Sequence, residues 1–300
     1  MLNVMAAREA SARPRSARPA RRWWLLGVAL MPLLSCRAEP AGPRVVRVAV
    51  VQLWGQPNQL DGNVTKAARL IREAAAEGAR YVVLPELYSL FLGTGNERPE
   101  ELRRKAQPLG GPLTATMLSL ARELGINIAY GMPERRGEEV YNSFVFVEPK
   151  GVAGVYSKRV LVTLGPPGAT EADTFTTGRQ VGALMWGGVA TGALICADAG
   201  FDARWQDTVA EGVQLIVVPA SGFGATFPGQ PTVGDRARAY GVPVVLANHW
   251  SPPAGFMSYG MSRIADAAGT VLRDAGNEPD KVIVADVTIP ERRPKTPAHP

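Results

Sequence analysis

Three side chains in this sequence could together perform nucleophilic catalysis without a histidine. Glu86 ends the run VVLPE, Lys158 lies in the run YSKR, and Cys196 ends the run TGALIC. A carboxylate can take the proton of a thiol, the resulting thiolate can attack a carbonyl carbon, and an ammonium can stabilise the oxyanion that develops. Taken singly, each residue has an ordinary interpretation, a buried small side chain for the cysteine and solvated charges for the other two.

The position of these residues in the chain favours a shared site. Glu86 and Cys196 each follow a short apolar run of the kind expected for a strand covered on both faces. Open α/β sheets place their ligands at the carboxyl ends of their strands. We therefore expect both side chains at the same edge of the fold.

The chain alternates segments with strand and helix character. Predicted helices cover residues 61–77, 113–124, 203–211 and 233–240, and predicted strands cover 45–53, 81–84, 126–130, 141–147, 152–156, 181–186, 189–195, 215–218, 242–246, 262–265, 270–272 and 282–287. Gly187-Gly188 predicts a tight hairpin turn. Interleaved helices and clustered hairpins predict an α/β fold with mixed sheets covered by helices, in one domain over residues 44–289.

The same stretch resembles the nitrilase superfamily of carbon–nitrogen hydrolases from residue 45 to residue 289. LPE at 84–86 resembles the family's glutamate motif, YSK at 156–158 its lysine motif, and LICAD at 194–198 its nucleophile motif. GMPE at 131–134, followed by YNS at 141–143, is similar to the segment that carries the family's second glutamate. The segments 244–248 and 258–269 also resemble family segments, and the matches occur in order along the chain.

The resemblance implies a fold and a set of roles. The fold is an α-β-β-α sandwich, often dimerised through its sheets, so a homodimer or higher homo-oligomer is expected. Glu86 would be the general base, and Cys196 would form a thioester acyl-enzyme. Lys158 and the backbone N–H of Ala197 would stabilise the oxyanion, and Glu134 would hold Lys158 or the substrate in place. No cofactor is implied.

Departures from the family pattern bear on the substrate. Ala197 follows the nucleophile where the family often has tyrosine, Ser157 precedes the lysine where arginine is common, and GFDAR at 200–204 replaces the usual RFPE. True nitrilases usually carry Trp-Glu after the cysteine, so Ala197-Asp198 argues against nitriles. The leading expectation is hydrolysis of a small-molecule substrate that is a linear, non-peptide amide or a carbamoyl compound.

Other functions remain open from the sequence. The same Glu-Lys-Cys set could hydrolyse a nitrile or transfer an N-acyl group, although the acyltransferase branch is embedded in a membrane domain that this chain lacks. A non-catalytic member could bind an amide-bearing ligand. A cysteine peptidase using His249 would lose all activity in His249→Ala, whereas the nitrilase-like mechanism predicts at most a modest effect.

Composition argues against two classes of partner. Residues 1–35 hold six arginines and one glutamate, so they carry +5 of the net charge of +6 and leave +1 for the rest. The body therefore has no excess positive field for nucleic acid. No CxxC, HxH or HExxH spacing occurs, so no metal site is expected.

The first 35 residues predict an export signal. An arginine-rich segment precedes an apolar run over 23–34, which is well short of the ~20 residues needed to span a bilayer. LLSC at 33–36 resembles a bacterial lipobox, which implies lipid attachment at Cys36, and Arg21-Arg22 also resembles a twin-arginine signal. We expect an exported, lipid-anchored protein of the cell envelope on the periplasmic or extracytoplasmic face, with a tether over 36–43 and a proline-rich tail over 290–300. Cys196 would then be the sole cysteine of the mature body, so no internal disulfide is expected.

Overall fold

The computed structural model describes residues 44–56, 59–90, 99–163, 168, 170–222, 231–251 and 260–296. Over these residues it contains two six-stranded sheets. The first has the order β12-β1-β2-β3-β4-β5, formed by β1 (Arg44–Gln52), β2 (Tyr81–Val83), β3 (Asn127–Arg136), β4 (Glu139–Glu148), β5 (Gly151–Ser157) and β12 (Lys281–Ile289). Strands β1, β2 and β3 run parallel, and the other pairings are antiparallel.

The second sheet repeats this mixed arrangement. Its order is β11-β10-β9-β8-β7-β6, formed by β6 (Ala183–Trp186), β7 (Val189–Ala193), β8 (Leu215–Ala220), β9 (Val244–Asn248), β10 (Arg263–Ala265) and β11 (Val271–Asp274). Here β7, β8 and β9 are the parallel strands. Each sheet therefore has a parallel centre whose carboxyl ends can carry functional residues.

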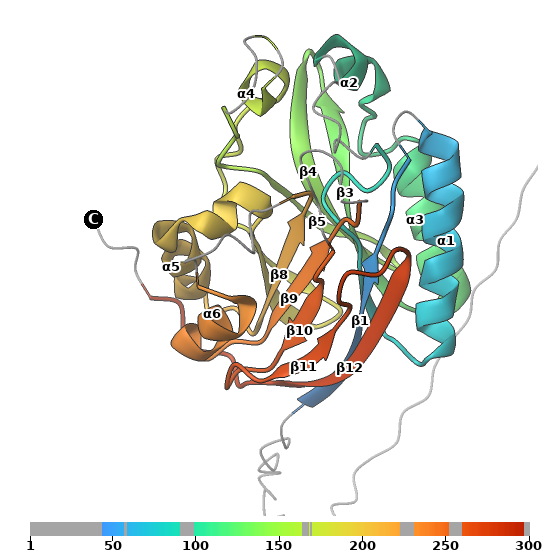
Figure 1. Cartoon of the computed structure of the whole chain (residues 1–300). Coiled ribbons are helices and arrows are strands. Elements are labelled where there is room, and N and C mark those ends of the chain that lie inside the picture. The colour runs from blue at the N-terminus through green and yellow to red at the C-terminus, as the bar shows by residue number, and fades with distance from the viewer. Residues whose placement is uncertain are drawn as a thin grey trace, which may run out of the picture. The chain divides into compact units, whose positions relative to one another are not determined.

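Helices cover the outer face of each sheet (Figure 1). Helices α1 (Leu60–Ala76) and α3 (Pro112–Leu124) pack on the first sheet, and α5 (Asp202–Ala210) and α6 (Val233–Tyr240) pack on the second. Two short helices, α2 (Pro99–Lys105) and α4 (Glu171–Thr174), lie together at one end. The layers are those of an α-β-β-α sandwich, which confirms the predicted fold class.

Alternating side chains on the strands fill two separate cores. On β1, Val48 and Val50 pack between the two sheets, whereas Ala49 and Val51 pack beneath α1 and α3. Because β1 is buried on both faces, it needs apolar residues at successive positions, and this explains its valine-rich run. The alternation also means that neighbouring residues on one strand serve opposite faces of the sheet.

Among the predicted strands, β3 differs most from its predicted bounds. The sequence predicted a strand over 126–130, but β3 continues to Arg136. It does so because the β3–β4 hairpin stays paired as far as Arg136 and Glu139. The predicted hairpin at Gly187-Gly188 is confirmed, since β6 and β7 pair directly on either side of it.

No helix within the described residues is long and apolar enough to cross a membrane. The predicted signal segment, Cys36 and the tether all lie outside the described residues, as does the end of the tail from residue 297.

Candidate active site

Glu86 follows the carboxyl end of β2 and is buried, with 2% of its surface exposed. Its Oε1 accepts hydrogen bonds from Lys158 Nζ at 2.8 Å and from Asn142 Nδ2 at 2.8 Å. Its Oε2 has no hydrogen bond to any described residue, so this oxygen is available to accept a proton. The turn around Glu86 packs tightly on β3, because a Cβ at Gly131 would lie 2.3 Å from the backbone nitrogen of Leu87. Only glycine allows this approach.

Lys158 follows the end of β5 and is 1% exposed. Its ammonium pairs with Glu86 at 2.8 Å and with Oε1 of Glu171 at 2.7 Å. Burial alone would lower the pKa of Lys158, but the two carboxylates outweigh it and raise the pKa well above its ordinary value. Lys158 is therefore a cation at neutral pH. Two of its three N–H donors are used by carboxylates, which leaves one for a substrate oxygen.

Cys196 follows the carboxyl end of β7 and opens the 3-10 helix η1 (Cys196–Gly200). Its φ of 47° is unusual for a residue other than glycine, and such strain is frequently found at functional turns. Burial, followed by the negative charge of Glu86, raises the pKa of the thiol to about 12, although Lys158 and the Ser221 backbone N–H oppose this. The resting thiol is therefore protonated, and it needs a base to become a nucleophile.

Glu171 joins this group without having been predicted from the sequence. It opens the short helix α4, and its Oε2 accepts a hydrogen bond from the Val162 backbone N–H at 2.8 Å while Oε1 pairs with Lys158. It lies in a segment rich in glycine, proline and threonine, at no strand end. The one signal in the sequence was Thr170 followed three residues later by Asp173, which form a capping box at the start of α4.

Glu134 lies on the face of the first sheet opposite to the one on which Asn142 contacts Glu86. Its carboxylate accepts hydrogen bonds from Arg136 Nε at 2.8 Å and from Ser143 Oγ at 2.6 Å. Ser143 follows Asn142 on β4, so their side chains serve opposite faces, and Asn142 is the one that contacts Glu86. The structure thus brings Glu86, Lys158 and Cys196 together with Glu171. It places Glu134 on the opposite face of the first sheet.

A family model described as carbon-nitrogen hydrolase matches residues 47–294 of this chain. The chain belongs to the carbon–nitrogen hydrolase family. It is 32% identical over 249 residues to a nitrilase of Pyrococcus abyssi, covering 82% of this chain and 90% of that protein. It is 30% identical over 252 residues to the omega-amidase NIT2 of Danio rerio, covering 81% and 88%.

The chain is also similar to a solved structure of an amidase whose active-site cysteine carries a covalent adduct. The chain matches a mutant of the amidase from Nesterenkonia sp. AN1 with a TM-score of 0.68 and 25% identity, covering 83% of this chain and 92% of that one. That structure shows covalent addition of the acetamide moiety of fluoroacetamide at the active-site cysteine of that amidase.

Ala197 is the second residue of η1 in this carbon–nitrogen hydrolase, directly after the cysteine. The first backbone N–H groups of a helix have no acceptor within the helix, so they can bind an anionic oxygen beside the nucleophile. The position fits the oxyanion role that the family resemblance implies for Ala197. Among the described residues, no group of three His, Cys, Asp or Glu side chains is arranged to hold a metal ion.

His249 is fully buried after β9, and its two ring nitrogens lie against backbone carbonyl oxygens. Nε2 is 2.8 Å from the oxygen of Glu86, and Nδ1 is 3.2 Å from the oxygen of Leu53. Burial lowers the pKa of His249 to about 4, so the imidazole is neutral at physiological pH. A neutral imidazole has a single N–H, so it donates a hydrogen bond to one of these two carbonyl oxygens while the ring packs between the Glu86 turn and the end of β1. This is a different role from the thiol base of a cysteine peptidase.

The depressed pKa of His249 predicts acid sensitivity. A neutral buried histidine contributes stability above its unfolded-state pKa of 6.5, and this contribution is lost as the pH falls toward about 4. We expect the free energy of unfolding to fall by about 3 kcal/mol over this range from His249, at about 1.4 kcal/mol per pH unit. Urea unfolding at a series of pH values measures this for wild type and His249→Gln. The free energy of unfolding should fall less steeply with decreasing pH in the variant. The same pH dependence of the unfolding free energy in both proteins would contradict the attribution to His249, because the chain's other histidine is His299 in the tail.

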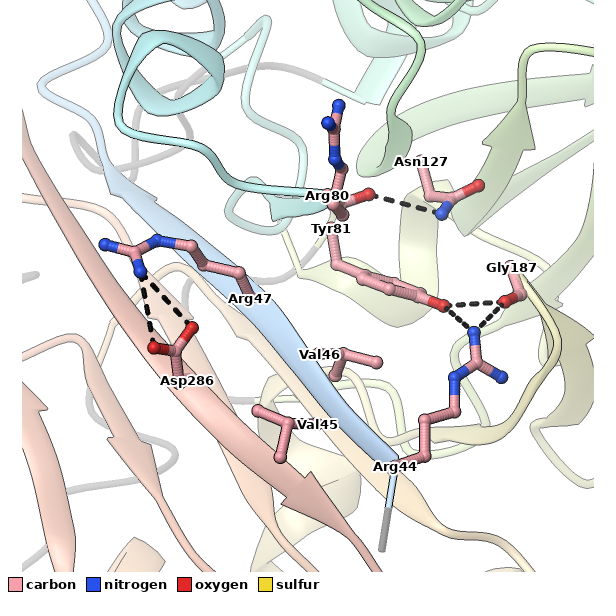
Figure 2. A pocket seen from close by; sticks show the side chains of 9 residues that line it. All are labelled: Arg44, Val45, Val46, Arg47, Arg80, Tyr81, Asn127, Gly187 and Asp286. Atoms are coloured by element: carbon pink, nitrogen blue, oxygen red, sulfur yellow. Dashed lines mark hydrogen bonds and ion pairs between the residues drawn. The ribbon is translucent and has the colours of Figure 1, made fainter. Parts of the chain in front are cut away.

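A cavity of about 400 Å³ opens at the amino end of β1, where that strand begins at Arg44 (Figure 2). Arg47 turns toward Asp286, 3.3 Å away, and Arg44 donates to the carbonyl oxygen of Gly187 at 2.7 Å. Arg80 points away from both (Figure 2). These guanidinium groups do not converge on a common point, and the catalytic candidates lie at the carboxyl ends of the strands, so this cavity is not their site.

Proposed function

We propose that this protein hydrolyses the carbon–nitrogen bond of a linear, non-peptide amide or carbamoyl compound through a thioester on Cys196. The observation that carries the proposal is the buried cation Lys158, held between Glu86 and Glu171 beside a strained cysteine. Membership of the carbon–nitrogen hydrolase family supports the bond class. The covalent adduct on the cysteine of the Nesterenkonia amidase supports the nucleophile.

Acylation begins with proton transfer from the thiol to Glu86 Oε2 as sulfur attacks the carbonyl carbon. The carbonyl electron pair moves to oxygen, and the oxyanion is stabilised by Lys158 and the Ala197 N–H. When the tetrahedral intermediate collapses, the carbon–nitrogen bond breaks and Glu86 returns the proton to the leaving nitrogen. The products are free ammonia or amine and a thioester on Cys196.

Deacylation reuses the same groups. Glu86 takes a proton from water, the hydroxyl attacks the thioester carbon, and the second oxyanion occupies the site formed by Lys158 and Ala197. The carbon–sulfur bond breaks, the carboxylic acid leaves, and the proton held by Glu86 returns to the sulfur. Atoms and charges balance with water as the sole co-reactant.

The experiment that tests this function is release of ammonia or amine from a panel of linear amides, carbamoyl compounds and nitriles. Release from amides or carbamoyl compounds is expected, with little from nitriles. Release from nitriles alone would replace the proposal with nitrile hydrolysis. Ligand binding without any release would support a non-catalytic binding protein.

The two glutamates predict different effects of matched substitutions. Glu171→Gln removes one of the charges that hold Lys158, and we expect kcat/KM to fall by about 10- to 10²-fold, because small misplacements of catalytic groups cost rates of this order. Glu134→Gln makes the same change in a side chain on the face of the first sheet away from Glu86. It should lower kcat/KM far less than Glu171→Gln. Steady-state kinetics of both variants measure the difference. A larger loss in Glu134→Gln would reverse the assignment of the supporting carboxylate.

The proposal extends to an exported, lipid-anchored protein of the cell envelope, on the basis of the lipobox-like LLSC at 33–36. We expect Cys36→Ala to move the protein from the membrane fraction to the soluble fraction, because the thiol that receives the lipid is lost. Fractionation followed by immunoblotting measures this. Unchanged membrane fractionation would contradict the lipid anchor.

A further inference from the structure

Asp198 lies two residues after the nucleophile, is fully buried, and uses both carboxylate oxygens. Oδ1 accepts from the backbone N–H groups of Arg159 at 3.1 Å and Val160 at 2.7 Å. Oδ2 accepts from the Tyr156 hydroxyl at 2.7 Å and from the Ile195 backbone N–H at 3.1 Å. The donors come from the residues that flank Lys158 and from the residue that precedes Cys196.

These hydrogen bonds join two segments that follow strands of different sheets. Lys158 follows β5, which belongs to the first sheet, whereas Cys196 follows β7, which belongs to the second. A backbone bridge between Leu53 and His249 joins the two sheets at the ends of β1 and β9. Lys158 and Cys196 follow β5 and β7 instead, so the side-chain links between their own segments bear on the spacing of the ammonium and the thiol. We propose that Asp198, bound by Tyr156, is the positioning residue that sets this spacing.

The chemistry of the pair suits a rigid link. Burial raises the pKa of Asp198, but the Tyr156 hydroxyl, Lys158 and the backbone N–H groups of Val160 and Ile195 favour its charged form. Burial and the nearby carboxylate raise the pKa of Tyr156, so its hydroxyl stays a donor. Charge-assisted hydrogen bonds are stronger than neutral ones, and a buried carboxylate that keeps four of them has little freedom to move.

The ion pair between Arg159 and Asp207, at 3.0 Å, crosses between the same two parts of the fold. It is more exposed than the Asp198 cluster, and exposed ion pairs contribute little. Asp198 is therefore the stronger connection between the lysine segment and the nucleophile turn. The inference rests on the proposed function in one respect, since it assumes that the reaction needs Lys158 beside the thiol.

Tyr156→Phe tests the inference with the smallest structural change, because it removes one hydroxyl and keeps the ring. We expect the rate of Cys196 alkylation by iodoacetamide, read from the peptide that contains Cys196, to fall by about 10- to 10²-fold. Tyr130→Phe is the matched control. It also removes a buried hydroxyl, which donates to Thr114 at 2.9 Å, but Tyr130 packs in the core beneath α1 and α3 and not between Lys158 and Cys196. The control should leave the alkylation rate unchanged at a similar loss of thermal stability.

A double-mutant cycle separates positioning from general destabilisation. In a Lys158→Gln background, Tyr156→Phe should change the alkylation rate by no more than about twofold, because a residue that acts through Lys158 has nothing left to position. Asp198→Asn, which turns an amide donor toward backbone donors, should slow alkylation at least as much as Tyr156→Phe. If Lys158→Gln does not fold, the comparison of Tyr156→Phe with Tyr130→Phe decides.

The outcomes separate this inference from the proposed function. Equal slowing by Tyr156→Phe in both Lys158 backgrounds, or no slowing, would overturn the positioning role even if the amide panel shows turnover. Slowing that requires Lys158 would support the role even if no compound in the panel is hydrolysed.

Discussion

Replacing Cys196 with alanine is expected to reduce amide hydrolysis by about 10⁶-fold, to the background rate. The alanine side chain has no nucleophile, so the acyl-enzyme cannot form, and neither Glu86 nor Lys158 can replace the missing bond to carbon. The substitution keeps the Cβ and therefore the backbone conformation at φ 47°. Product release measured with the best compound of the panel, at high enzyme concentration, gives the comparison.

The controls for this result concern folding and chemistry. Thermal unfolding of Cys196→Ala should stay close to that of the wild type, because only one sulfur atom is removed. Cys196→Ser should also be severely impaired, since a hydroxyl is a weaker nucleophile than a thiol and both ring nitrogens of His249 face backbone carbonyl oxygens. Substantial hydrolysis by a folded Cys196→Ala protein would contradict the mechanism.

Replacing Lys158 with methionine is expected to damage both activity and stability. Loss of an oxyanion donor typically lowers rates by ~10²–10³-fold, and Lys158 also holds the base. Methionine fills the space but leaves the carboxylates of Glu86 and Glu171 buried without their cation. Removing one partner of a buried ion pair costs about 3–5 kcal/mol of unfolding free energy.

The pH dependence of this stability loss has a definite sign. In the wild type, the raised pKa of Lys158 means that its contribution is fully present below 10.5 and is lost only at more alkaline pH. Burial already raises the pKa of Glu171 above 4.5, and Lys158 is the main group that opposes this rise. In Lys158→Met the pKa of Glu171 should rise further, so the variant should lose stability relative to wild type as the pH rises through the wild-type pKa of Glu171, which lies above 4.5.

Urea unfolding between pH 4 and 8 measures this difference, with Lys158→Arg as the variant that keeps the charge. A constant stability difference between Lys158→Met and wild type across that range would contradict the electrostatic account of the site. Lys158→Arg should retain most of the stability but little of the rate, because its planar guanidinium presents its donors with different geometry.

Helices over mixed sheets were predictable from the sequence because the signals are local and repeated, whereas the sandwich followed from the family resemblance. Valine-rich runs such as β1 are buried on both faces, and Gly187-Gly188 closes a two-residue hairpin. Glu86 and Cys196 were predictable because each follows an apolar strand, where the topology gathers functional groups. The predicted length of β3 was wrong, because β3 stays paired with β4 beyond Pro133, as far as Arg136.

The supporting carboxylate required information that the sequence does not hold locally. Glu171 lies in an irregular segment, and its approach to Lys158 depends on where the chain after β5 places the start of α4. Glu134 stands in a recognisable motif, but its face of the sheet follows from the register that places Ser143 and Asn142 on opposite sides. Motif order along the chain does not encode either of these three-dimensional facts.

Acyl-enzyme trapping tests the central claim most directly. Wild-type enzyme is mixed with an excess of the best amide, quenched in acid within a single turnover, digested, and analysed by mass spectrometry. The mechanism predicts a mass increase equal to the acyl group on the peptide that contains Cys196, and its removal by hydroxylamine, as expected for a thioester. Turnover accompanied by an acyl group on a different residue, or by an unmodified Cys196 peptide at every quench time, would contradict it.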